Sequence, residues 1–153
     1  MALFFDTFLN KLDAKGRVSV PATFRAALNG QSFHGVLAMP SLKYSAIQCA
    51  GIDWMEELGR KVNQADFLSD EHDDLTAALF GDTKQLPFDG EGRVVLPSSL
   101  AAHACIADIA AFVGRGPFFE IWHPKTLETY KVEARKRALE KGRTLSLRQG
   151  DKT

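Results

Sequence analysis

The sequence predicts a mixed α+β fold assembled from two copies of one small unit. Residues 12–21 read Leu-Asp-Ala-Lys-Gly-Arg-Val-Ser-Val-Pro, and residues 88–97 read Phe-Asp-Gly-Glu-Gly-Arg-Val-Val-Leu-Pro. Segments of alternating polarity flank each copy of this pattern, and a short helical pattern follows each one. The chain has 153 residues, 45% hydrophobic and 25% charged, which suits one globular domain or two small ones. Strands and helices interleaved within two short repeats indicate the α+β class.

Each repeated turn is built from residues that reverse the chain. Asp13 and Asp89 can accept hydrogen bonds from the backbone ahead of them. Gly16 and Gly92 can adopt a positive φ. The arginine that follows each glycine can also pair with the aspartate, so a purely structural role stays open for both residues.

The segments on either side of the first turn are expected to be strands. Residues 8–12 and 17–20 alternate in polarity, so they are expected to pair as a hairpin. Val18 and Val20 then face inward, and Arg17 faces outward.

The other elements follow in the same order in both copies. Short helices are expected over residues 22–28 and 98–104, each begun by a proline. The further strands are expected at residues 35–39, 44–49, 109–113 and 118–122, and the further helices at 52–62, 70–81 and 124–141. The chain divides into a first unit (residues 4–50), a helical spacer (51–83), a second unit (84–125), a C-terminal helix (126–142) and a flexible tail (143–153).

Charge is balanced overall but segregated along the chain. With 19 basic and 19 acidic residues, the chain has no uniformly basic coat for nucleic acid. Residues 10–28 nevertheless carry four basic groups against one acidic group, whereas residues 53–74 carry eight acidic groups against two basic ones. Such segregation can confine a cationic footprint to one face.

Several classes of protein are disfavoured. No apolar run reaches the roughly 18 residues of a membrane span, and no signal peptide is recognised. Cys49 and Cys105 make neither a disulfide framework nor a metal motif. No hydrolase, zinc-protease or phosphate-loop motif occurs, and residues 71–74 fit a surface helix better than a metal site. We expect a cytoplasmic protein that is not an enzyme and needs no cofactor.

The duplicated turn resembles the MraZ family, whose members are built from two AbrB-like units. The resemblance covers nearly the whole chain and includes Phe119-Glu120-Ile121-Trp122 before the last helix. It implies a duplicated swapped-hairpin β-barrel with short peripheral helices, and a ring-like homo-oligomer. It also implies a nucleoid-associated repressor that binds short direct repeats at its own promoter and at the division and cell-wall gene cluster. The alternative is an AbrB-type antitoxin-like or scaffold protein that acts through protein contacts.

Four cations are the candidate DNA-binding residues, and they lie in or beside the two turns: Lys11, Lys15, Arg17 and Arg93. Lysine and arginine bind phosphates, and arginine also reads guanine. Glu91 occupies the place in the second turn that Lys15 has in the first, which departs from what a DNA-facing turn favours. We therefore expect the first turn to face DNA and the second to serve the barrel or a subunit interface.

Overall fold

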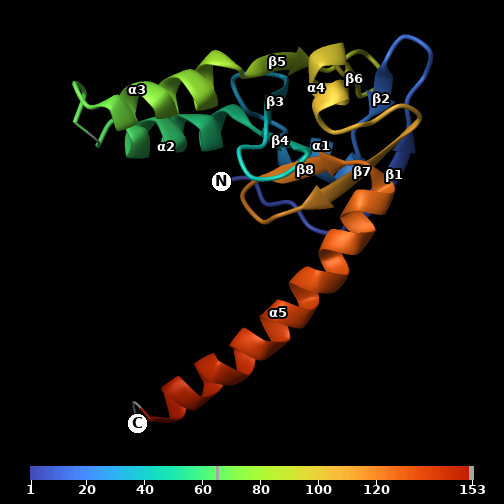
Figure 1. Ribbon diagram of the computed structural model, residues 1–153. Helices are drawn as coiled ribbons and strands as arrows, with labels where there is room; N and C mark the ends of the chain where they lie inside the picture. The colour runs from blue at the N-terminus through green and yellow to red at the C-terminus, as the bar shows by residue number, and fades with distance from the viewer. Residues whose placement is uncertain (65, 152–153) are drawn as a thin grey trace. The chain divides into compact units, whose positions relative to one another are not determined.

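The chain forms two compact units. The computed structural model describes residues 1–64 and 66–151, with the side chains of the last helix described through Gly142. Met1–His123 is one compact unit, and the helix α5 (Pro124–Asp151) makes up the second (Figure 1). In the first unit the strands are β1 (Thr7–Lys11), β2 (Arg17–Ser19), β3 (Gly35–Pro40), β4 (Ala46–Ala50), β5 (Lys84–Pro87), β6 (Arg93–Val95), β7 (Ile109–Gly114) and β8 (Phe119–Trp122). Its helices are α1 (Ala22–Ala27), α2 (Ile52–Val62), α3 (Asp70–Thr76), the π-helix η1 (Ala77–Gly81) and α4 (Ser98–His103).

The strands of the first unit form two antiparallel sheets. The larger sheet has six strands in the order β1-β7-β8-β4-β3-β5, and the smaller pairs β2 with β6. The expected α+β class is therefore confirmed. Among the described residues, hydrogen-bonded pairing leaves β1 and β5 at the two edges of the larger sheet, so these pairs do not close a barrel.

The two copies of the repeat exchange their first strands. β1 of the first copy pairs with β7 of the second, with Phe8 opposite Phe112. Reciprocally, β5 of the second copy pairs with β3 of the first, with Leu86 opposite Val36. The exchange joins two units that are each too small to bury much core alone, because each completes the sheet of the other.

The expected pairing of the two strands around the first turn is wrong. β1 pairs with β7, and β2 pairs with β6. The turn between them still closes, because the amide of Asp13 donates to the carbonyl of Arg17 at 3.0 Å. β2 has three residues, whereas β7 matches all five residues of β1, so the longer ladder lies between the copies.

One hydrophobic core is shared by both copies. Phe4 and Phe24 of the first copy pack against Phe119 of the second, with ring centroids 4.9 and 4.8 Å from that of Phe119. The expected inward orientation of Val18 and Val20 is confirmed, because both are buried in this core. A second, smaller cluster joins β3 to the buried face of α2.

The helices follow the sequence with two differences. α2 spans the expected residues, and α1 and α4 each follow a proline. The expected helix over residues 70–81 is divided into α3, capped by the Ser69 hydroxyl, and the π-helix η1. α5 continues through Gly142 to Asp151, past the end expected from that glycine.

Candidate nucleic-acid interface

The first turn is closed by one carboxylate. Asp13 Oδ1 accepts hydrogen bonds from the backbone amides of Lys15 and Arg17, both at 2.9 Å. Asp13 Oδ2 accepts from Arg17 Nε at 2.6 Å. Gly16 has φ +78°, a conformation that favours glycine. Asp13 therefore holds the backbone of the turn and orients the side chain of Arg17, the first residue of β2.

The second turn repeats this geometry. Asp89 Oδ1 accepts from the amides of Glu91 and Arg93 at 2.9 Å, and Asp89 Oδ2 accepts from Arg93 Nε at 2.9 Å. Gly92 has φ +76°. The two turns are thus the same local structure, as their shared residues predict.

Both aspartates are held in the ionised form. The backbone amide of Arg17 is the main cause that lowers the pKa of Asp13, and the backbone amide of Arg93 does the same for the pKa of Asp89. The hydrogen bond to Asp89 raises the pKa of Arg93, and the charges of Glu91 and Asp13 add to that effect. Asp13 of the first turn therefore acts electrostatically on the arginine of the second.

The ribbon β2–β6 brings the two turns to one surface. Val18 pairs with Val94 at its centre, and both side chains are buried. Side chains alternate along a strand, so the flanking residues point to the opposite, exposed face: Arg17, Ser19, Arg93 and Val95. We call this set the ribbon face.

The two arginines are neighbours on the ribbon face. Arg17 lies opposite Val95, and Arg93 is two residues before Val95 on the same strand. Diagonal pairs of this kind lie roughly 7–8 Å apart in antiparallel sheets. The side chains of Arg17 and Arg93 are 35% and 27% exposed, and Val95 is 56% exposed. Sequence reasoning treated the two turns separately, because their juxtaposition depends on pairing between the copies.

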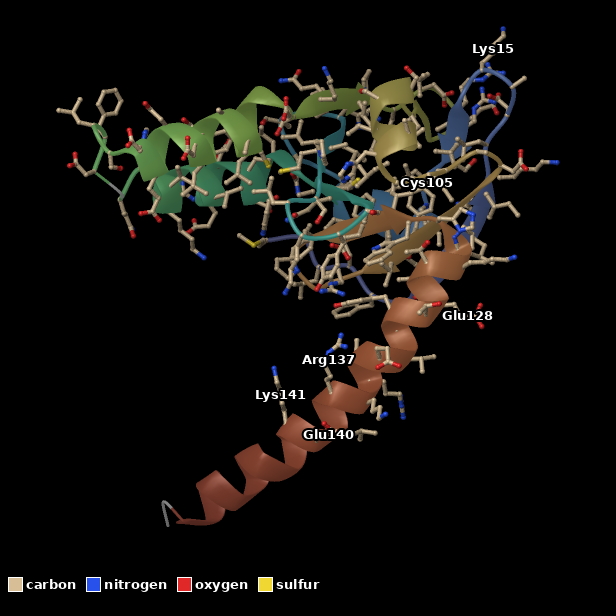
Figure 2. The ribbon with its side chains drawn as sticks, viewed as in Figure 1. Lys15, Cys105, Glu128, Arg137, Glu140 and Lys141 are labelled. Atoms are coloured by element: carbon tan, nitrogen blue, oxygen red, sulfur yellow. The ribbon has the colours of Figure 1, made fainter. Side chains whose placement is uncertain are left out.

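The remaining candidate cations lie beside the ribbon face. Lys15 projects from the exposed tip of the first turn (Figure 2). Lys11 ends β1 and lies opposite Ile109 in the larger sheet. At the second turn, Glu91 Oε2 lies 3.7 Å from Arg93 Nη2. The first turn therefore presents an extra positive charge where the second presents a negative one.

Sequence reasoning missed a fifth cation, Arg25. Arg25 lies in α1 of the first copy, but its guanidinium packs against Gly92 of the second turn. The excess of basic residues over positions 10–28 was a signal that included Arg25, but sequence alone could not place it at the second turn.

The histidine of the acidic spacer and one pocket are further candidate places for a metal or a small molecule. His72 in the acidic spacer is buried against Phe67, with ring centroids 5.3 Å apart. Within residues 1–64 and 66–151, no three His, Cys, Asp or Glu side chains come together as a metal site. A pocket of about 290 Å³ beside η1 is lined by Leu37, Ile52, Met55, Glu56, Phe80, Thr83 and Gln85. This lining is mainly apolar and contains no nucleophile paired with a base. In the part of the chain that the structure describes, no helix is long and apolar enough to cross a membrane.

Comparison with known proteins identifies close relatives. A family model described as "MraZ protein, putative antitoxin-like" matches residues 79–148. A protein of Rickettsia bellii (strain OSU 85-389) named "Transcriptional regulator MraZ" is 45% identical over 146 residues, covering 95% of this chain and 97% of the relative. A protein of the same name from Rickettsia africae (strain ESF-5) is 46% identical over 145 residues, with the same coverage. The similarity therefore spans both copies of the repeat.

Proposed function

Because this chain belongs to the MraZ family, we propose that it is a transcriptional regulator that binds double-stranded DNA through the ribbon face and its two flanking turns. The observation that carries the proposal is the diagonal placement of Arg17 and Arg93 on one exposed strand pair. Relatives that share 45–46% of its residues are named transcriptional regulators, which supports the regulatory role.

The ribbon face is a two-stranded β-ribbon that carries arginines, which supports a role in reading the major groove. The major groove is roughly 12 Å wide and admits a two-stranded β-ribbon. Each arginine is anchored at Nε by its own turn aspartate. Its terminal nitrogens then carry the donors that bind guanine or phosphate. The turn aspartate thus orients each arginine through Nε, and at Arg93 the Glu91 carboxylate also lies 3.7 Å from Nη2.

Phosphate contacts are assigned to cations at the edges of this surface. Lys15 extends from the tip of the first turn, and Lys11 lies at the start of the same loop. Such contacts fix the register of the protein on DNA and make binding dependent on salt. Because Arg93 shares the ribbon face with Arg17, we propose that both turns contact DNA and that Glu91 makes the second contribution smaller.

We further propose that the two AbrB-like units form a swapped-hairpin β-barrel. The exchange of β1 and β5 between the copies supports this assignment, as does the single core to which both copies contribute. Short helices α1 and α4 follow the two turns at equivalent places.

Repression through direct repeats requires more than one copy of this surface. A single ribbon face offers few contacts, so we propose a ring-like homo-oligomer that binds several short repeats side by side. Exposed apolar side chains supply surface for such assembly, including Phe5, Phe67 and Leu68, which are 67%, 75% and 86% exposed. The DNA in this proposal is the chain's own promoter and that of the division and cell-wall gene cluster, and the protein acts in the cytoplasm at the nucleoid.

A second function is an antitoxin-like or scaffold role. The family description includes the term "antitoxin-like", and the same exposed apolar residues could bind another protein. The ribbon face discriminates between the two functions, since a protein-binding role does not require two arginines on an exposed strand pair.

The experiment is a fluorescence anisotropy titration with DNA from upstream of the protein's own gene and a scrambled duplex. The chain is expected to prefer the upstream DNA, and Arg17→Ala is expected to remove that preference. Arg60→Ala is the matched control, because Arg60 is exposed on α2 and pairs only with Glu57 among the ion pairs of the described residues. Equal binding of both duplexes by the wild-type chain would overturn the proposal.

A further inference from the structure

Arg25 links the first copy of the repeat to the turn of the second. Its Nε donates to the carbonyl of Val20 at 3.1 Å, which anchors the side chain beside β2. A Cβ built on Gly92 would lie 2.7 Å from both Cδ and Cζ of Arg25. The guanidinium therefore packs against the Cα of Gly92. A side chain at position 92 would occupy the same space as the guanidinium.

The first turn has no such neighbour. The repeat places Ala101 of α4 where Arg25 stands in α1, because Pro21 and Pro97 precede the two helices by equal spacing. A Cβ built on Gly16 would meet one atom of the described chain within 4 Å, the carbonyl oxygen of Leu96 at 3.3 Å. The space that Arg25 fills at the second turn is thus not occupied by a side chain at the first.

The two turns also differ in formal charge. In the first turn Lys15 and Arg17 stand against Asp13, a formal charge of +1. In the second turn Arg93 stands against Asp89 and Glu91, a formal charge of −1. Arg25 brings the formal charge at the second turn to zero and places its guanidinium next to Gly92.

We propose that Arg25 is a phosphate-binding residue of the second turn, supplied by the first copy. This inference rests on the proposed DNA-binding function and adds a residue to its surface. Because Nε is engaged by Val20, the terminal nitrogens are the groups that meet DNA. Arg25 is half-buried beside the second turn, and an arginine so placed suits a phosphate, whose contacts position a protein on the duplex. The proposed ligand of Arg25 is a phosphate of the DNA backbone. The proposal is refuted if Arg25 serves only to pack against Gly92.

The test is a salt titration of full-length protein on its own upstream DNA. Arg25→Met keeps an apolar stem and removes the charge, and Ala101→Arg installs the equivalent cation at the first turn. Arg25→Met is expected to weaken binding roughly tenfold, the size of one charge-assisted contact. It should also make the log–log salt slope shallower by about 0.9 for each phosphate that the variant no longer neutralises. Ala101→Arg should tighten binding and steepen the slope, and the double variant should recover much of the affinity.

Control variants distinguish a failure of the Arg25 contact from a failure of the proposed DNA binding. Arg60→Met should change neither affinity nor slope, and circular dichroism should show that each variant is folded. An Arg25→Met variant with an unchanged salt slope, whether or not its affinity falls, overturns the phosphate contact. If Arg25→Met fails to fold, Arg25→Gln takes its place, and an unchanged slope in that variant overturns the contact. If Arg17→Ala loses binding to the upstream DNA and Arg25→Met does not, this inference alone is refuted. If the wild-type chain shows no preference for its upstream DNA, the proposed function is refuted.

Discussion

Val18 of the first copy lies opposite Val94 of the second at the centre of the β2–β6 ribbon. These valines are equivalent positions of the repeat, so the ribbon has an approximate two-fold relation between the copies. The amide of Leu96 donates to the carbonyl of Gly16 at 2.9 Å, and that of Val20 donates to the carbonyl of Gly92 at 3.2 Å. Duplication thus produces one symmetric ribbon with a turn at each end.

The ribbon should depend equally on its two central valines. Val18→Ala and Val94→Ala each remove buried methyl groups and should lower the free energy of unfolding by about 2 kcal/mol. Urea denaturation followed by circular dichroism measures both. A decrease confined to one variant would contradict the shared core.

Acid should weaken the turns through their aspartates. The folded-state pKa values of Asp13 and Asp89 lie below the ordinary value of about 3.9, so the folded chain binds fewer protons than the unfolded chain in that range. The stabilisation is present above that value and is lost as the pH falls through the folded-state pKa. Asp13→Asn together with Asp89→Asn should therefore flatten the dependence of the urea midpoint on pH below about 4. An unchanged acid limb in the double variant would contradict this role.

The two turn glycines should differ in their tolerance of a side chain. Gly16→Ala and Gly92→Ala both place alanine at a positive φ, which costs on the order of 1–3 kcal/mol. Gly92→Ala should cost more, because the added methyl displaces the Arg25 side chain and its hydrogen bond to Val20, whereas a methyl on Gly16 meets only the carbonyl oxygen of Leu96 at 3.3 Å. Thermal unfolding compares the two variants. In the Arg25→Ala background the difference should shrink, and a difference that persists would contradict the packing of Arg25 on Gly92.

The tip residues of the turns should affect DNA binding in opposite directions. Lys15→Glu should weaken binding, because it places a negative charge where a phosphate approaches. Glu91→Lys should strengthen binding, mainly to nonspecific DNA. Titrations of both duplexes at two salt concentrations measure these effects. Unchanged binding by Glu91→Lys would contradict the placement of the second turn at the DNA backbone.

Assembly should be visible without DNA. Light scattering after size exclusion is expected to give a homo-oligomer above a dimer, because one ribbon face cannot supply enough contacts alone. A monomer at micromolar concentration would remove the side-by-side binding of repeats. A homo-oligomer that lacks DNA binding would favour the scaffold function.

Sequence reasoning succeeded where the determining interactions are local. The Asp13 and Asp89 turns are closed by amides within four residues, so their geometry could be predicted from residue types alone. The bounds of α2 followed from its pattern in the same way.

The sequence did not predict the features that depend on contacts between distant residues, or on a residue that a helix merely tolerates. The predicted hairpin was wrong because β1 pairs with β7, about a hundred positions later in the chain. Nothing in the sequence of residues 8–12 indicates that β7 is the pairing strand. The contact of Arg25 with Gly92 arises from the same exchange. α5 passes Gly142 because a glycine within a helix costs only about 1 kcal/mol relative to alanine.

The central claim is that Arg17 and Arg93 form one DNA-binding surface. The most direct measurement is a single DNA titration of Arg17→Ala, Arg93→Ala and the control Arg60→Ala, each shown to be folded by circular dichroism. Both ribbon variants should bind the upstream DNA more weakly than the control, with the larger decrease for Arg17→Ala because Glu91 already offsets Arg93. Binding by both ribbon variants that equals that of Arg60→Ala would contradict the account.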